Sequence, residues 1–436
     1  MKKKLTAVGV YVFAGGFSLG VRKHFDVLAH FEDGPFGVAT AKHNIKKLQV
    51  FEDPSSWPLS DFAGRIDYLY ANPPCAPWSN AGSRIDRIPW QKNPLTACWR
   101  RTAELVWQLQ PKVAHIESVR PLYTKGREMI DEIIARGRKE GYQGIAILED
   151  ALDCNMAQRR PRFVLCLTKY EYQATPTHGK DVTPLDVLMN YYQAVVPNAN
   201  NRKAAQANGG THQALTLRHT KPGEKLIRAY NHHLREKLKG KGAPSMIPKR
   251  LHPFKNSPTQ TGQAVIFTMG NLRHAAPDLA KTIEGKILKV TKPGQRLSRA
   301  HDEMFPNKKP VDGKMQGRPS MLKYRISPDK PSATQPGGAI LFHHKEDRYL
   351  TIGEAAALCS YPHDFEFIGS ISSAYAQMGK AVMPNVGEHL GHDARLTVER
   401  ARKLKNLEPL EISIRRTEVT MRPMPVDALK APIRAR

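Results

Sequence analysis

Cys75 is the first side chain in the sequence whose type and position suggest chemistry. It lies in residues 67–82, DYLYANPPCAPWSNAG, directly after an apolar run and two prolines. Proline fixes φ and removes a backbone donor, so the pair restricts the backbone where a strand passes into a loop. We expect the strand end to present Cys75 at the rim of a sheet, although a cysteine there is also a common small apolar side chain.

A carboxylate and several guanidinium groups accompany this thiol. Glu117 follows the apolar run KVAHI, and a carboxylate that ends a buried strand needs a proton, a ligand or a cation to offset its desolvation. Residues 158–162, QRRPR, supply three guanidinium groups that can bind an anion or a carbonyl group. A nucleophile, an acid and cations together suit a substrate that is attacked and protonated at once.

A glycine turn lies near the amino end, in VYVFAGGFSLG, residues 10–20. Glycine lets a ligand approach the backbone closely, although this turn alone is weak evidence. Glu32 ends the next apolar run, where an acidic residue commonly binds ribose hydroxyls in α/β sheets. The alternative for Glu32 is an exposed carboxylate at a strand end.

The elements that must position these residues follow an α/β pattern. Helical stretches at 94–110 and 124–141 alternate with β-rich runs at 5–13, 25–32, 66–73, 112–118, 144–150 and 162–167. This alternation predicts a mostly parallel sheet, in which ligands bind at the carboxyl ends of the strands. Four distinctive stretches fall at those ends and predict one active-site rim: Phe13–Gly20, Pro73–Ser79, Glu117–Val119 and Asp153–Arg162.

The composition indicates a soluble globular protein of two domains. The chain has 436 residues, 40% of them hydrophobic, and no apolar run long enough to span a membrane. A basic start followed by an apolar stretch is typical of a secretory signal, but its closely spaced glycines favour a strand entering a turn. The cysteines show no disulfide or metal spacing, so we expect a reducing, cytoplasmic location and no metal; they are residues 75, 98, 154, 166 and 359.

Basic charge is concentrated in one region. The net charge is +27, and residues 201–330 contain 27 Lys and Arg against 8 Asp and Glu, an excess of +19. Counterion release drives binding of such a region to a nucleic acid, so a phosphate polyanion is the expected partner. The alternative is a solvated basic surface that serves solubility.

The same region contains a linker and an internal repeat. Residues 198–210, NANNRKAAQANGG, predict a linker. TKPGEKLIRA at 220–229 recurs as TKPGQRLSRA at 291–300, and SPTQTGQAVIF at 257–267 recurs as SATQPGGAILF at 332–342, which predicts a duplicated unit of about 70 residues. Helical patterns return near 350. We therefore divide the chain into a catalytic lobe, a basic lobe, a return segment and a basic tail with a short strand at 411–420; their bounds are 1–195, 196–344, 345–400 and 401–436.

Six blocks, in order, resemble the DNA (cytosine-5) methyltransferase family. The first four are FAGGFSLG from residue 13, NPPCAPWSNAG from 72, ESV from 117 and QRRPR from 158. The last two are RYLTIGEAAALCSYPHDF from 348 and QMGKAVMPNVG from 377. The resemblance implies a Rossmann-like, S-adenosylmethionine-dependent methyltransferase lobe, with the basic region as a smaller target-recognition lobe.

The resemblance also implies catalytic roles. Cys75 would attack carbon 6 of a cytosine flipped out of double-stranded DNA, and Glu117 would protonate or hydrogen-bond ring nitrogen 3. Arg162 would bind the base carbonyl, and Arg160 would steady the loop or a phosphate. The implied cofactor-binding residues are Phe13, Ala14, Gly15, Gly16, Glu32, Asp53, Pro74, Lys380, Ala381 and Val382. Of these, Phe13, the glycine pair, Glu32 and Asp53 would contact the ring, methionine tail, ribose and adenine, respectively.

Four features depart from the family pattern. The glycine loop is two residues shorter than usual, Ser118 replaces Asn, Trp78 replaces Phe, and Lys380 replaces the Asn of Gly-Asn-Ala-Val-Pro-Pro. A lysine beside the sulfonium of S-adenosylmethionine is repelled unless it points away or pairs with a carboxylate. Alternatively, Lys380 binds the carboxylate of carboxy-S-adenosylmethionine, and the product is 5-carboxymethylcytosine.

Two further alternatives stay open from the sequence. A basic lobe does not distinguish DNA from RNA, so an RNA cytosine-5 methyltransferase is possible, and so is a DNA-binding protein without catalysis. We expect a monomer in a bacterial or phage-infected cell. Restriction, regulation and viral self-protection all fit as its role.

Overall fold

A computed structural model describes residues 5–32, 35–53, 57–79, 88–176, 182–195, 283–304, 323–338, 340–369 and 371–404. Its central element is a seven-stranded sheet in the order β3-β2-β1-β4-β5-β7-β6. The strands are β1 (Thr6–Val10), β2 (Asp26–Phe31), β3 (Gln49–Phe51), β4 (Tyr68–Ala71), β5 (Val113–Val119), β6 (Gln143–Asp150) and β7 (Pro161–Thr168). β1 to β5 pair in parallel, and β7 runs antiparallel to both β5 and β6. The prediction of a mostly parallel α/β sheet is confirmed.

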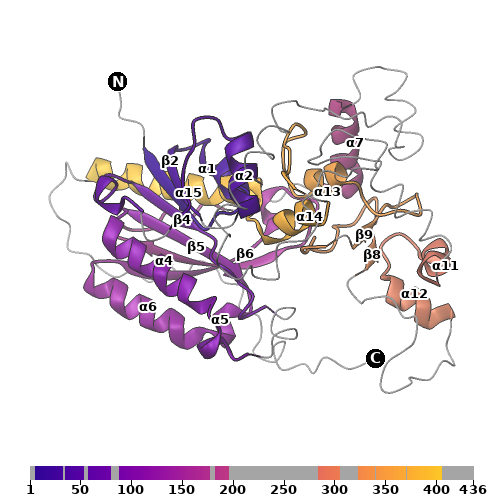
Figure 1. Cartoon of the computed structure of the whole chain (residues 1–436), viewed down its shortest axis with the longest axis horizontal. Coiled ribbons are helices and arrows are strands. Elements are labelled where there is room, and N and C mark those ends of the chain that lie inside the picture. Colours follow the sequence, from indigo (N-terminus) through magenta and orange to yellow (C-terminus); the bar gives the residue numbers. More distant parts are fainter. Residues whose placement is uncertain are drawn as a thin grey trace, which may run out of the picture.

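Helices cover both faces of the sheet (Figure 1). Because successive strand residues point to opposite faces, Ala7 of β1 belongs to one hydrophobic cluster and Val8 to the other. α4 (Thr96–Leu109) and α6 (Arg127–Lys139) pack on the Val8 side, and α1 (Gly16–Val21) and α15 (Pro384–Leu404) on the Ala7 side.

Two elements differ from the sequence expectations. The helix expected over 124–141 is two helices, α5 (Leu122–Lys125) and α6, which meet at Gly126. A Cβ on Gly126 would lie 2.7 Å from Nε1 of Trp78, so the close packing of this turn requires glycine. The three residues of β3 are too few to give a recognisable alternation, and the sequence analysis missed that strand.

The last helices return to the first part of the sheet. α13 (Ile352–Leu358) begins with a capping box between Thr351 and Glu354, and Glu354 also forms a buried ion pair with Arg348 at 2.7 Å. α14 (Ile371–Lys380) leads into α15, which packs so closely on α1 that a Cβ on Gly20 would clash with its backbone. Residues more than 350 positions apart therefore form one hydrophobic core.

A smaller group of elements lies beside the sheet (Figure 1). It includes α7 (Pro184–Val195), α11 (Ile283–Val290), α12 (Leu297–Met304), β8 (Tyr324–Arg325) and β9 (Leu341–Phe342). A separate apolar cluster holds part of it together: Ile287, Leu288, Leu297, Ala300 and Phe342. The linker at 198–210, the first copies of the repeated blocks and the strand at 411–420 lie outside the described residues, so the recognition lobe, the duplication and the domain bounds stay predictions.

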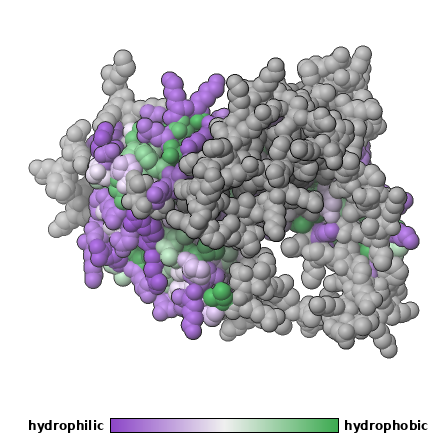
Figure 2. All heavy atoms as spheres, viewed as in Figure 1, coloured by the Kyte–Doolittle hydropathy of each residue, from purple (hydrophilic) through white to green (hydrophobic). Residues whose placement is uncertain are grey.

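The visible surface of the sheet-bearing part is largely hydrophilic (Figure 2). No helix within the described residues has the length and hydrophobicity needed to span a bilayer. All five cysteines are free thiols. The described residues also contain no group of three or more metal-ligating side chains.

Candidate active site

The carboxyl ends of β1, β2, β4 and β5 meet the start of β7 at one edge of the sheet. Because β7 is antiparallel, its first residues lie beside the last residues of β5: Arg162 pairs with Val119, and Phe163 pairs with Ser118. Glu117 lies two residues before Val119, so its side chain and that of Arg162 project from the same face. The topology thus brings together two side chains 45 positions apart in the sequence.

Glu117 is buried between two hydrogen-bond donors. Its Oε1 lies 2.8 Å from Nε of Arg162, and its Oε2 accepts a hydrogen bond from Nδ2 of Asn72. Burial raises the pKa of Glu117, whereas the charges of Arg162 and Arg160 and the two hydrogen bonds oppose this rise. Burial is the largest of these effects, so the pKa of Glu117 lies above the usual value of a glutamate.

Cys75 begins a tight turn four residues after the last residue of β4, Ala71. Its carbonyl oxygen accepts hydrogen bonds from the backbone N–H groups of Trp78 and Ser79, each at 3.1 Å. Pro74 precedes it and is partly buried. The turn fixes the place of Cys75 at the end of the strand.

The resting Cys75 side chain is a thiol. Burial raises its pKa, the negative charge of Glu117 adds to the rise, and Arg162 and Arg160 oppose it. A thiol is a much weaker nucleophile than a thiolate, so Cys75 must lose its proton before it can attack a substrate.

Arg160 binds backbone carbonyls. Its Nη1 donates to Gln335 O at 3.1 Å, and its Nη2 donates to Gly379 O at 2.8 Å and Ala381 O at 3.0 Å. Burial lowers its pKa to about 10. This arrangement ties the start of β7 to the end of α14 and favours a positioning role for Arg160 over contact with a base.

Phe13 and Glu32 meet at the ends of β1 and β2. The backbone N–H of Phe13 donates to Oε2 of the buried Glu32 at 2.6 Å. Two residues on, Gly15 has φ of 84°, a left-handed conformation that suits glycine, and precedes the first turn of α1. The glycine loop and the strand-end carboxylate thus form one surface at this edge.

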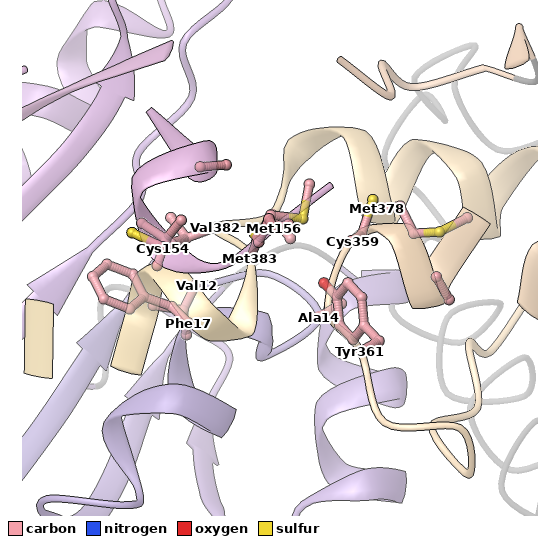
Figure 3. Close-up of a cluster of buried hydrophobic side chains, with 14 of the residues drawn as sticks. Val12, Ala14, Phe17, Cys154, Met156, Cys359, Tyr361, Met378, Val382 and Met383 are labelled. Atoms are coloured by element: carbon pink, nitrogen blue, oxygen red, sulfur yellow. The ribbon is translucent and has the colours of Figure 1, made fainter. Parts of the chain in front are cut away.

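The remaining predicted cofactor residues differ in exposure. Figure 3 shows Ala14 and Val382 in a buried hydrophobic cluster, to which Ala381 also belongs. A Cβ on Gly16 would lie 2.5 Å from the Tyr361 hydroxyl oxygen and from the Val382 carbonyl oxygen, so the loop fits tightly against the return segment. Asp53 is exposed, two residues beyond β3.

Lys380 ends α14 with its side chain directed at Phe13. Its Nζ lies 5.2 Å from the centroid of the Phe13 ring, within the range of a cation–π contact. Within the described ranges, Lys380 forms no ion pair with a carboxylate.

The sequence analysis gave no role to two groups that support the site. Asn72 lies directly before Pro-Pro-Cys, and that adjacency was the available signal. Asp150 accepts hydrogen bonds from the backbone N–H groups of Arg160, at 2.7 Å, and Leu152, at 3.3 Å, and so fixes the approach to β7. No local pattern marks it.

Comparisons with known proteins identify the family. The family model for C-5 cytosine-specific DNA methylase matches residues 10–395. The chain is 24% identical over 392 residues to the type II methyltransferase M1.HphI of Haemophilus parahaemolyticus. The aligned region covers 87% of this chain and 84% of that one. It is 29% identical over 174 residues to the type II methyltransferase M.NgoMIV of Neisseria gonorrhoeae, covering 39% and 53% of the two chains.

A solved structure supports the fold. It is a DNA modification methyltransferase encoded within a prophage (E. coli), with a TM-score of 0.50 at 17% identity over 91% of this chain and 99% of that one. The family model includes the Cys75 turn, the start of β7 and the return segment within its 10–395 range. The chain therefore belongs to the C-5 cytosine-specific DNA methylase family and is a DNA (cytosine-5) methyltransferase, an activity that implies S-adenosylmethionine as methyl donor.

Proposed function

We propose that this enzyme methylates carbon 5 of a flipped cytosine in double-stranded DNA through a covalent adduct with Cys75. One observation carries the proposal: the Cys75 turn, Glu117 and Arg162 meet at one edge of the sheet, with Arg162 Nε 2.8 Å from Glu117 Oε1. A nucleophile, an acid and a fixed cation are the groups that addition to a cytosine ring requires.

Each of these side chains has one task. The Cys75 thiolate forms a bond to carbon 6, and the electron pair of the 5,6 double bond makes carbon 5 nucleophilic. Glu117 donates a proton or a hydrogen bond to ring nitrogen 3, and Arg162 binds the base carbonyl, so both stabilise the charge that develops in the ring. After methylation, loss of the carbon 5 proton and release of Cys75 restore the double bond.

The residues at the carboxyl ends of β1 and β2 are suited to binding S-adenosylmethionine. When bound, this cofactor supplies an electrophilic methyl group on a sulfonium. The carboxylate of Glu32 is a suitable acceptor for ribose hydroxyls, and its place at the end of β2 is the usual one for that contact. We assign Phe13, the Gly15 and Gly16 turn and Asp53 to the same site, with the backbone of Pro74 and residues 380–382 as its walls.

We assign DNA binding to the basic residues of 201–330, because neutralised phosphates release counterions. Two relatives are named type II methyltransferases, which favours a role beside a restriction enzyme. We expect a cytoplasmic monomer. Methylation of structured RNA in preference to duplex DNA, measured with the same enzyme preparation, would support the RNA alternative instead.

Adduct trapping on duplex DNA that contains 5-fluorocytosine tests the mechanism. Fluorine at carbon 5 cannot leave as a proton does, so the wild-type enzyme with S-adenosylmethionine should form a complex that survives denaturation. Cys75→Ser should form none. An enzyme that methylates ordinary DNA but forms no adduct would contradict the proposed role of Cys75, and DNA binding without methylation would favour the non-catalytic alternative.

Lys380 supports a second candidate, carboxymethyl transfer from carboxy-S-adenosylmethionine. Its ammonium lies over the Phe13 ring, on the side of the site assigned to the cofactor, and it is free of carboxylate partners among the described residues. A cation there could form a charge-assisted hydrogen bond with a donor carboxylate. Competition between the two donors, followed by mass spectrometry of the nucleosides, tests this candidate, and formation of 5-methylcytosine alone would exclude it.

A further inference from the structure

Glu149, near the end of β6, is a second buried carboxyl group close to Glu117. Its side chain is 4% exposed, and its Oε1 accepts a hydrogen bond from Sγ of Cys154 at 2.8 Å. Its Oε2 is buried and has no hydrogen-bond partner in the part of the chain that the structure describes. Such an atom carries a desolvation cost unless a water molecule pairs with it, so its presence points to a bound water.

The strand register places Glu149 next to the catalytic pair. Glu149 pairs directly with Arg162, which pairs on its other side with Val119, two residues beyond Glu117. Arg162 therefore lies between the two carboxyl side chains on one face of the sheet.

A small cavity connects these groups. It has a volume of about 10 Å³, close to what one water molecule needs, and its lining includes Glu117, Glu149, Arg160, Arg162, Val382 and Met383. Figure 3 shows Cys154, the partner of Glu149, in the same buried cluster as Val382 and Met383. Four of the residues that line the cavity have charged or titratable side chains: Glu117, Glu149, Arg160 and Arg162.

The surroundings of Glu149 favour its protonated form. Burial raises its pKa to about 8, the Cys154 hydrogen bond opposes the rise, and the nearby carboxylates add to it. His389 offers a way to solvent, because its Nε2 lies 3.8 Å from Glu149 Oε1 and its side chain is 19% exposed. The titratable and charged groups that face Glu149 are Tyr68, Glu117, Asp153, Cys154, Arg160, Arg162, Tyr172, His389 and Asp393.

We propose that Glu149 stores the proton that Glu117 uses, and exchanges it with Glu117 through one water in this cavity. The inference rests on the proposed acid role of Glu117. The O–H bond of Glu149 breaks as its proton passes to the water, and another proton of that water bonds to the Glu117 carboxylate. Glu149 is left as a carboxylate beside the Cys154 thiol. The transfer reverses when ring nitrogen 3 returns its proton to Glu117, so no proton is consumed.

Glu149 acts through Glu117 and is a positioning residue, so its test needs a readout that a structural role would not change. Glu149→Gln keeps the size of the side chain and an acceptor for Cys154 but cannot hold the proton. We expect single-turnover methylation by the full-length enzyme to slow about tenfold near pH 7, with cofactor and DNA affinity unchanged. Because wild-type Glu149 loses its proton above a pH of about 8, the ratio of the two rates should fall towards one there.

Two cysteine variants sharpen this pH profile. Cys154→Ala removes a hydrogen-bond donor that stabilises the ionised form of Glu149, so the pKa of Glu149 should rise. The ratio of the Cys154→Ala rate to the Glu149→Gln rate should therefore fall at a higher pH than the ratio of the wild-type rate to the Glu149→Gln rate. Cys166→Ala removes another buried thiol, on β7; among the described residues the thiol hydrogen-bonded to Glu149 is that of Cys154, so this variant should leave the profile unchanged.

Three results would overturn the proposal: equal rates for wild type and Glu149→Gln, a slowing that is the same at every pH, or no shift with Cys154→Ala. If Glu149→Gln does not fold, the pH dependence of the methylation rate itself still decides: the fall in rate should lie at higher pH in Cys154→Ala than in wild type, and at the wild-type pH in Cys166→Ala. Glu117→Gln separates the proposed acid role of Glu117 from the proposed proton store at Glu149. Normal methylation by that variant removes the acid role itself, whereas an impaired Glu117→Gln with a normal Glu149→Gln removes only the proton store.

Discussion

The two halves of the strand-end edge hold their charged groups in different ways. In the half formed by β4, β5 and β7, Glu117 is buried between Arg162 and Asn72. In the half formed by β1, β2 and α14, Lys380 is exposed and its ammonium lies over the face of the Phe13 ring. The first half is a connected network. In the second half Lys380 is a separable contact, and the buried Glu32 accepts a hydrogen bond from the backbone N–H of Phe13.

This difference predicts different consequences of substitution. Removing one partner from a buried, hydrogen-bonded set leaves the others unpaired, at a cost of about 1–3 kcal/mol or more for each group. Removing the exposed Lys380 contact leaves no buried group unpaired, and Glu32→Gln keeps an acceptor for the Phe13 N–H. We therefore expect changes in the first half to abolish turnover, and changes in the second half to alter cofactor affinity or donor choice.

The largest effect should come from Cys75→Ser. A neutral hydroxyl is a far poorer nucleophile than a thiolate, so turnover should fall by about four orders of magnitude or more. DNA affinity should stay within about threefold, because the side chain hardly changes in size. Steady-state methylation and a gel-shift titration measure the two quantities. A rate within tenfold of wild type would contradict nucleophilic catalysis by Cys75.

Glu117→Gln should have the next largest effect. The amide keeps the shape of the side chain but neither donates a proton nor balances the charge of Arg162, so kcat should fall by about 100- to 10,000-fold. Glu132→Gln, an exposed carboxylate on α6, is the matched control and should change kcat by less than about twofold. Comparable rates for both variants would mean that the buried network is not needed for chemistry.

The sequence allowed the sheet to be predicted, together with the placement of three candidate site residues at one edge of it. Each long strand is an apolar run bounded by turn residues, and Cys75, Glu117 and Arg162 directly follow or open such runs. Parallel strands bring their carboxyl ends to one edge, so residues at those ends could be grouped without knowing their distances.

The supporting contacts could not be predicted, because they join segments far apart in the chain. The guanidinium of Arg160 binds Gly379 and Ala381, about 220 positions away, and no local pattern specifies that contact. Glu149 lies near the end of an expected strand, but only the register opposite Arg162 places it at the cavity lined by Glu117 and Arg162. A six-residue helix such as α1 also carries too little periodicity to be predicted by itself.

In the second half of the edge, Glu32→Gln should weaken cofactor binding more than chemistry. The loss of a charged acceptor for ribose hydroxyls costs about 1.5–3 kcal/mol, so KM for S-adenosylmethionine should rise about 10- to 100-fold while kcat falls less than about threefold. Glu52→Gln, whose carboxylate pairs with Lys42 at 2.6 Å, is the neighbouring control and should leave KM unchanged. A collapse of kcat with constant KM would place Glu32 in the connected network instead.

Lys380→Asn should have the smallest effect on methylation. A cation–π contact at an exposed site stabilises the resting loop by only about 0.5–1 kcal/mol, so the rate with S-adenosylmethionine should change by less than about fivefold, and upward, because an amide does not repel the sulfonium. If Lys380 pairs a donor carboxylate, the same variant should lower the share of 5-carboxymethylcytosine formed in a competition between the two donors. Lys380→Arg keeps the charge and should retain that share. A large loss of methylation in Lys380→Asn would show that Lys380 belongs to the connected half of the site, because an isolated exposed contact cannot account for it.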